Sequence, residues 1–182
     1  MSCKSIWLKR VLVLIPAIVQ LSCGHQDEKK TTLAQPGKGE LADLNRYLIT
    51  KDRERIQNYI ERKGLRMTET KTGLWYQILK EGEGETLREK DRLVIDYECT
   101  LLDGTKCYSS RETGPKELVL GRSEMEAGMN EGLRLLKPGS EAIFIIPPFL
   151  AYGLIGDRKL IPPRAVLVYN IRVRSKTQGN LK

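Results

Sequence analysis

Residues 93–101 have the sequence LVIDYECTL, and this stretch decides the fold class of the 182-residue chain. From Leu93 onward every second side chain is apolar, whereas the side chains between them include Asp96 and Glu98. A period of two with one apolar face is typical of a half-buried β-strand. Asp103-Gly104 then favours a tight turn, so we predict that residues 105–108 return beside this strand as a hairpin.

The same pattern predicts further strands on both sides of the hairpin. Apolar side chains alternate in residues 74–79 and 167–173, and shorter apolar stretches occupy residues 118–121 and 142–146. One helix is predicted before Pro138-Gly139, with one apolar face made of Met125, Met129, Leu133 and Leu136. These strands around one short helix give an α+β domain, in which a curved antiparallel sheet wraps the helix to bury its apolar face.

An amphipathic helix is predicted before this domain, within an N-terminal helical segment at residues 41–69. Its apolar residues recur at three- and four-residue spacing, and Gly64 is a typical helix stop. A break near Thr50 is one possibility. The helix serves either dimerisation or client binding, or it packs on its own domain; the irregular apolar spacing favours packing. All site motifs lie in residues 70–176, which we expect to fold alone, before a polar tail at 177–182.

The first 23 residues have the layout of an export signal. Basic residues precede an apolar stretch at 11–19, which is too short for the roughly 20 residues that cross a bilayer. Leu21-Ser22-Cys23 resembles the end of a bacterial lipoprotein signal, although Gln20 departs from the usual aliphatic residue. We therefore predict removal of residues 1–22, a lipid anchor on Cys23 and a flexible tether at 23–40. The alternative is a plain signal peptide with an incidental cysteine.

The composition is that of an ordinary globular protein, with 40% hydrophobic and 30% charged residues. Without Lys4, Lys9 and Arg10, which lie in the segment expected to be removed, the formal net charge falls from +8 to +5. A small excess dispersed among acidic residues is typical of a solvated surface. No nucleic-acid partner is predicted.

Ordered short motifs connect these elements to a known family. They are Val94-Ile95-Asp96-Tyr97, Ser109-Ser110-Arg111, Leu120-Gly121, Glu131-Gly132, Pro138-Gly139, Ala151-Tyr152-Gly153 and Ile161-Pro162-Pro163. In this order and spacing, residues 73–174 resemble the FKBP-type peptidyl-prolyl cis-trans isomerases. Residues 45–73, together with the export signal, further resemble gliding-motility-associated isomerase lipoproteins.

The resemblance implies catalysis of rotation about X-Pro amides, which face a spontaneous barrier of ~18–20 kcal/mol. Such catalysis needs an apolar pocket and well-placed hydrogen-bond donors, so no cofactor, metal or nucleophile is implied. His25, the single histidine, lies in the predicted tether and is expected to be inert. The implied substrates are proline-containing exported polypeptides, met at the periplasmic side of the cell envelope. Alternatives are a non-catalytic chaperone or binding module of the same fold, and a structural part of an envelope complex.

Site residues follow from the resemblance, position by position. Tyr97, Tyr152 and Ile161 match catalytic positions, the last through its backbone amide. Pocket positions are occupied by Cys107, Tyr108, Met125, Glu126, Met129 and Tyr169. The family usually has phenylalanine and aspartate at 107 and 108, aliphatics at 125 and 126, and tryptophan or leucine at 129. These substitutions predict weak activity or a changed sequence preference.

Two cysteines remain in the predicted mature domain, Cys99 and Cys107. A two-residue turn would pair Thr100 with Cys107, whereas a three-residue loop with Gly104 in the left-handed region would place Cys99 opposite Cys107. The resemblance favours the second register. Either a cross-strand disulfide or two buried free thiols is compatible with it.

Overall fold

The structure is a computed structural model that describes residues 37–122 and 125–177. The predicted signal, Cys23 and most of the tether lie outside the described residues, as does the tail from residue 178. The elements are α1 (Lys38–Lys63), β1 (Thr68–Glu69), β2 (Trp75–Lys80), β3 (Arg92–Leu101), β4 (Lys106–Ser109), α2 (Ser110–Thr113), β5 (Lys116–Val119), α3 (Ala127–Leu133), β6 (Glu141–Ile146), η1 (Pro148–Leu150) and β7 (Leu167–Thr177).

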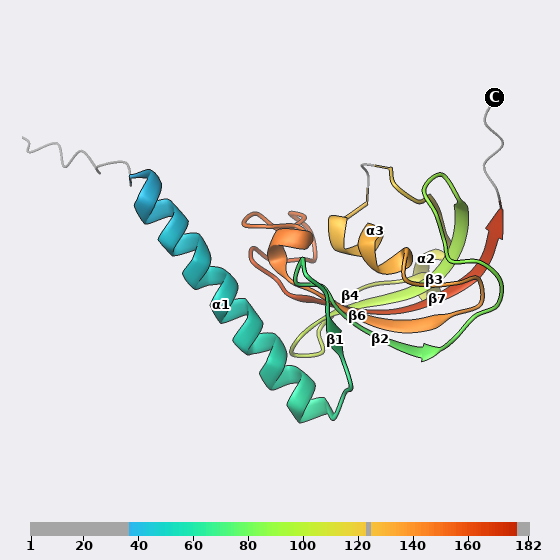
Figure 1. Cartoon of the computed structure of the whole chain (residues 1–182), viewed down its shortest axis with the longest axis horizontal. Coiled ribbons are helices and arrows are strands. Elements are labelled where there is room, and N and C mark those ends of the chain that lie inside the picture. The colour runs from blue at the N-terminus through green and yellow to red at the C-terminus, as the bar shows by residue number, and fades with distance from the viewer. Residues whose placement is uncertain (1–36, 123–124, 178–182) are drawn as a thin grey trace, which may run out of the picture. The chain divides into compact units, whose positions relative to one another are not determined.

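The strands form one antiparallel sheet, ordered β1-β2-β6-β7-β3-β4, with β5 paired to the first half of β3. Its longest pairing joins β3 and β7, from Leu101 opposite Leu167 to Arg92 opposite Thr177. The predicted α+β class and curved sheet are confirmed (Figure 1). Within the described residues the sheet has seven strands, of which β2–β7 correspond to the six predicted stretches and β1 was not predicted. A two-residue strand such as β1 is too short to show any alternation in the sequence.

The main core lies between the inner face of the sheet and α3 (Figure 1). The alternation predicted for the long strands is confirmed, since Leu93, Ile95, Cys99, Leu167, Tyr169, Ile171 and Val173 are all buried in it. Gly132 lets α3 approach β6, because a Cβ atom there would lie 2.5 Å from the Phe144 ring. The helix itself is shorter than predicted, and Leu136 is buried just beyond its end.

The β3–β4 hairpin contains the three-residue loop but not the predicted cysteine pairing. The Leu101 amide donates to the Thr105 carbonyl at 2.9 Å, and Gly104 adopts the positive φ of 92° that this loop requires. A β-bulge then intervenes, so Cys99 pairs with Tyr108 and Cys107 is the extra residue. The predicted pairing of Cys99 with Cys107 is therefore wrong. Both cysteines are buried free thiols.

Helix α1 is continuous through Thr50, and only its C-terminal half is packed. Ile56 and Tyr59 are 1% and 9% exposed, in a second core with Ile145, Val166 and Val168. This confirms packing for that half, whereas Leu41, Leu44 and Tyr47 are about half exposed. The packed unit thus includes residues that the sequence assigned to a separate helical segment at 41–69. In the described parts of the chain, no helix is long and apolar enough to cross a bilayer.

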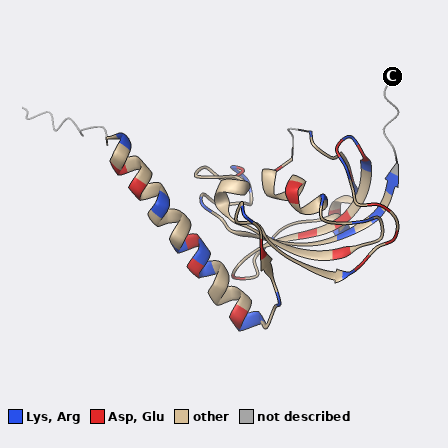
Figure 2. Cartoon of the chain, viewed as in Figure 1, with Lys and Arg blue, Asp and Glu red and all other residues tan. Residues whose placement is uncertain are grey.

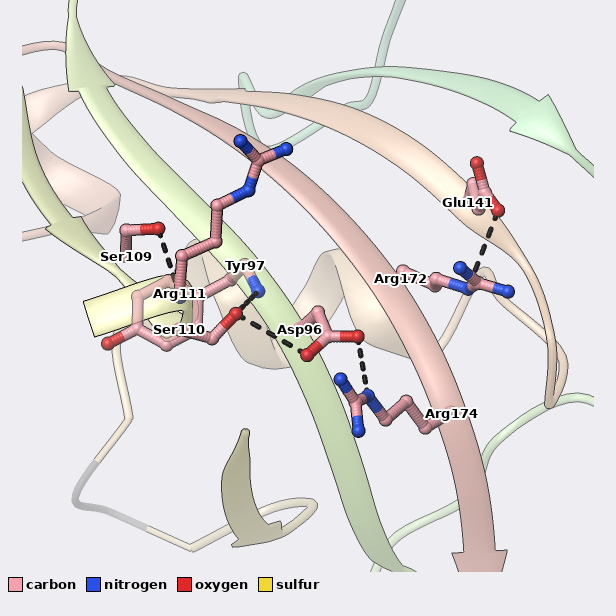
Figure 3. Close-up of polar contacts among 8 residues, drawn as sticks. All are labelled: Asp96, Tyr97, Ser109, Ser110, Arg111, Glu141, Arg172 and Arg174. Carbon is pink, nitrogen blue, oxygen red and sulfur yellow. Dashed lines mark hydrogen bonds and ion pairs between the residues drawn. The ribbon is translucent and has the colours of Figure 1, made fainter. Parts of the chain in front are cut away.

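Charge explains where α1 stops covering the outer face of the sheet. Away from α1 this face holds ion pairs, with Arg172 Nε 3.5 Å from Glu141 and Arg174 Nε 2.5 Å from Asp96 (Figure 3). Along α1, acidic and basic residues are interspersed (Figure 2). Because desolvating these charged groups is costly, the polar end of the outer face stays in water.

Candidate active site

A cavity of about 340 Å³ opens between β3, β5, the start of α3 and the loop from η1 to β7, residues 151–166. We call this segment the η1–β7 loop. The cavity is lined by Ile95, Tyr97, Tyr108, Lys116, Leu118, Met125, Glu126, Met129, Tyr152, Asp157, Lys159 and Tyr169. Apolar side chains and tyrosine hydroxyls thus share one concave surface, as is usual for sites that bind small groups.

Most of the residues predicted from the sequence meet at this cavity, but two do not line it. Cys107 and Ile161 are buried and are not among the lining residues, and Cys107 Sγ lies 3.6 Å from the Leu160 carbonyl. Burial raises the pKa of the Cys107 thiol, and it raises that of Cys99 to about 12. These thiols are therefore apolar packing groups at neutral pH and not pocket-lining ones.

Tyr97 is held in place from the outer side of the sheet. The pairing of β4 with β3 ends opposite Glu98, and the Tyr97 amide donates instead to Ser110 Oγ at 3.0 Å. Ser110 Oγ in turn donates to Asp96 Oδ1 at 3.4 Å (Figure 3). Within the cavity the Tyr97 ring packs against Tyr169, with centroids 6.3 Å apart. The side chain of Ser110 thus accepts the hydrogen bond that a neighbouring strand would otherwise accept from Tyr97, which lines the pocket.

Glu126 is stabilised by a hydroxyl donor inside the pocket. Tyr169 donates to Glu126 Oε1 at 3.1 Å. Burial raises the pKa of Tyr152 well above its usual value, and the negative charge of Glu126 adds to this effect. Burial likewise raises the pKa of Tyr169. Both hydroxyls stay protonated at neutral pH, and the hydrogen bond from Tyr169 offsets part of the desolvation cost of the carboxylate.

Asp157, which the sequence did not single out, organises the opposite rim. Tyr108 donates its hydroxyl to Asp157, and this hydrogen bond raises the pKa of Tyr108 to about 12. Asp157 Oδ1 also accepts from the amides of Lys159 and Ile161, each at 2.8 Å. Burial opposes ionisation of Asp157, but these hydrogen bonds outweigh it and lower the pKa. The Ile161 amide, which the resemblance assigns to ligands, is thus already occupied.

The remaining lining residues were also missed as site residues. Ile95 was expected on the inner face, but nothing in its alternation marks the pocket. Lys116 lies at the start of β5, two residues before the predicted strand, and its Nζ is 5.8 Å from the centroid of the Tyr97 ring. Gly156-Asp157 is a turn dipeptide, which is the one local signal that could have drawn attention to Asp157.

Chemically, the cavity combines uncharged tyrosine hydroxyls, apolar walls and the charged side chains of Lys116, Glu126, Asp157 and Lys159. The walls formed by Ile95, Leu118 and Met129 can remove water from an amide that enters. A dry environment disfavours the charge-separated amide resonance form, and it strengthens a hydrogen bond to the carbonyl oxygen. The geometry therefore suits twisting of an amide held by its carbonyl.

Sequence comparison places these features in a family. The model of the FKBP-type peptidyl-prolyl cis-trans isomerase family matches residues 83–174. A probable FKBP-type isomerase FkpA of Neisseria meningitidis is 39% identical over 104 residues, covering 57% of this chain and 38% of that protein. FkpA of Escherichia coli K12 is 33% identical over 123 residues, covering 68% of this chain and 44% of that protein. The chain therefore spans less than half the length of these two curated relatives.

Structural comparison agrees with the family model. The crystal structure of FkpA from Escherichia coli is similar with a TM-score of 0.62 and 26% identity, covering 80% of this chain and 75% of that one. The N-terminal domain of FKBP42 from Arabidopsis thaliana is similar with a TM-score of 0.58 and 28% identity, covering 62% and 93%. With the tyrosine-lined cavity lying inside the matched range, the chain belongs to the FKBP-type peptidyl-prolyl cis-trans isomerase family.

Proposed function

We propose that this chain catalyses cis–trans isomerisation of X-Pro bonds in exported polypeptides. The observation that carries the proposal is the cavity itself, which is lined both by Tyr152 and by the apolar side chains of Met129 and Leu118. The prolyl ring occupies the apolar part, and Tyr152 donates to the carbonyl of the twisting amide. Stabilisation of the twisted state, rather than of either planar isomer, accelerates rotation.

Turnover of a panel of short X-Pro peptides tests this proposal. We expect measurable acceleration over the spontaneous reaction, with a preference among residues X that reflects Glu126 and Asp157. Refolding of a protein limited by proline isomerisation provides a second readout on a natural chain. Absence of acceleration in both assays, by a chain shown to be folded, would remove the enzymatic proposal.

A second candidate is a binding module without catalysis, and one specific observation favours it. Two donors that an isomerase would offer to a substrate already have a partner, since the Ile161 amide and the Tyr108 hydroxyl both donate to Asp157. A substrate carbonyl must displace this partner before it is held. A binding module suppresses aggregation of an unfolded client without accelerating its slow refolding phase, which separates the two candidates.

We further propose that the chain works from the cell envelope, anchored by lipid on Cys23. Support comes from the basic, apolar and Leu-Ser-Cys order of the first 23 residues. Intact mass measurement of the protein from native membranes tests this. The expected product lacks residues 1–22 and carries a lipid mass on Cys23, whereas an unmodified Cys23 would contradict the anchor.

A further inference from the structure

Helix α1 contacts the η1–β7 loop through a partly buried ion pair, in which the carboxylate is the buried member. Asp52 of α1 is 3% exposed, and its Oδ2 lies 2.8 Å from Nη2 of Arg164. The other carboxylate oxygen faces Arg55 of the same helix at 3.5 Å. A carboxylate this deeply buried depends on its partners, because isolated charges are rarely stable away from water. Residues 112 positions apart in sequence are thereby joined.

Arg164 connects this pair to the residues of the candidate active site. Its amide donates to the Gly153 carbonyl at 3.0 Å, directly after Tyr152. Gly153 itself donates to the Pro148 carbonyl at 2.8 Å, which closes the start of the loop onto η1. The contact thus runs from Asp52 through both the side chain and the backbone of Arg164 to Gly153, the residue that follows Tyr152 in the chain.

The backbone conformation of Arg164 is one that must be maintained by surrounding contacts. Its φ of 56° lies in the left-handed region, which is uncommon for a residue that carries a Cβ atom. Such a conformation persists where surrounding contacts determine it, and such residues cluster at functional sites. The 2.8 Å ion pair and the 3.0 Å backbone hydrogen bond are the contacts available here.

We propose that Asp52 and Arg164 are positioning residues, through which α1 holds the η1–β7 loop so that Tyr152 faces the substrate amide. The proposal rests on the proposed isomerase function. The floor of the cavity comes from α3 and the sheet and is independent of the pair. Loss of the pair therefore leaves peptide binding nearly intact but misplaces the donor in the transition state, so that kcat falls and KM does not.

Kinetics of Asp52→Asn, Arg164→Gln and the double variant test the pair on short X-Pro peptides. We expect each single variant to lower kcat about tenfold, because small misplacements of catalytic groups cost this much or more. The double variant should lose no more than either single variant, since one interaction is removed in all three. Arg164→Lys, which keeps the charge, should recover part of kcat.

Arg53→Gln is the matched control. Arg53 is the neighbour of Asp52 on α1 and pairs with Glu69 of β1, so its loss also removes an ion pair between α1 and the sheet but leaves the loop untouched. Its kcat should stay at the wild-type value. An equal fall of kcat in Arg53→Gln, or wild-type kcat in folded Asp52→Asn and Arg164→Gln, would overturn the proposal. If Asp52→Asn does not fold, Asp52→Leu with Arg164→Met replaces the pair by apolar groups and should show the same loss of kcat.

Amide hydrogen exchange separates failure of this proposal from failure of the isomerase function. If wild-type protein shows no turnover, the proposed function is wrong, but the pair is still tested by its effect on the loop. The Arg164 amide should exchange at least about tenfold faster in Asp52→Asn than in Arg53→Gln, since its acceptor at Gly153 is no longer held. Equal exchange in both variants would show that the pair does not position the loop.

Discussion

The inner and outer faces of the sheet differ in how a helix reaches them. On the inner face, α3 lies over strands that are apolar along most of their length. On the outer face the strands change character along their length, from charged residues such as Glu141 and Arg172 to apolar ones such as Ile145 and Val168. Helix α1 packs only on the apolar end, with the same half that bears Ile56. Two helices thus stabilise one sheet, and the second belongs to the packed unit although it precedes every site motif.

The largest effect on stability is expected from deletion of everything before Thr70, because it removes the helix from the outer face of the sheet. It removes α1 and β1, exposes Ile145 and Val168, and leaves β2 without its edge partner. We expect the remaining chain to lose cooperative unfolding, as measured by thermal denaturation followed by circular dichroism. A truncated chain that melts cooperatively at the wild-type temperature would show that the outer face needs no cover.

Ile56→Ala tests the same contact with a single side chain. Because Ile56 is fully buried, we expect the free energy of unfolding to fall by about 2–5 kcal/mol in urea titrations. Leu44→Ala, on the half of α1 where Leu44 is 52% exposed, is the matched control and should change it by less than about 0.5 kcal/mol. Equal losses of unfolding free energy in the two variants would contradict the structure, in which only the half of α1 that bears Ile56 is packed.

Tyr97→Ala tests the inner face of the sheet, where Tyr97 lines the cavity. Loss of this aromatic wall admits water to the substrate amide, and we expect kcat/KM on X-Pro peptides to fall by at least about tenfold, or ~1.4 kcal/mol. Thermal melts must show that the variant is folded at the assay temperature. Wild-type turnover in folded protein would remove Tyr97 from the site.

Tyr152→Phe should have a smaller effect, because it removes one hydroxyl and keeps the ring. A single hydrogen bond contributes about 0.5–1.5 kcal/mol, so kcat/KM should fall about two- to tenfold. If Tyr97→Ala and Tyr152→Phe both retain full turnover, the cavity does not catalyse, and the binding module becomes the better account.

The smallest effect is expected at the polar end of the outer face. Arg172 and Glu141 have side chains that are 62% and 38% exposed, and exposed pairs contribute less than about 1 kcal/mol. Arg172→Gln should therefore leave both the unfolding free energy and kcat/KM nearly unchanged. A loss as large as that of Ile56→Ala would show that charge on the outer face contributes to the fold.

Much of the site could be anticipated because its residues lie in ordered motifs on regular strands and one helix. Tyr97, Met129, Tyr152 and Tyr169 line the cavity as the family resemblance implied. Asp157 could not be found in this way, since its partner Tyr108 is 49 positions away and in the family the carboxylate is usual at 108. The hydrogen bond from the Ile161 amide could not be predicted either, because it depends on where the Asp157 side chain points.

The sequence by itself determined the long strands, because the direction of each side chain along a strand follows locally from a period of two. It also determined the helix stop at Gly64 and the presence of a turn at Gly104, since both depend on the backbone freedom of one residue. Only the tertiary structure decided that Cys107 lies in a bulge, that half of α1 covers the sheet and that Asp52 meets Arg164. Each of these depends on groups far apart in sequence, whose meeting is set by packing and by the cost of leaving charge or apolar surface without a partner.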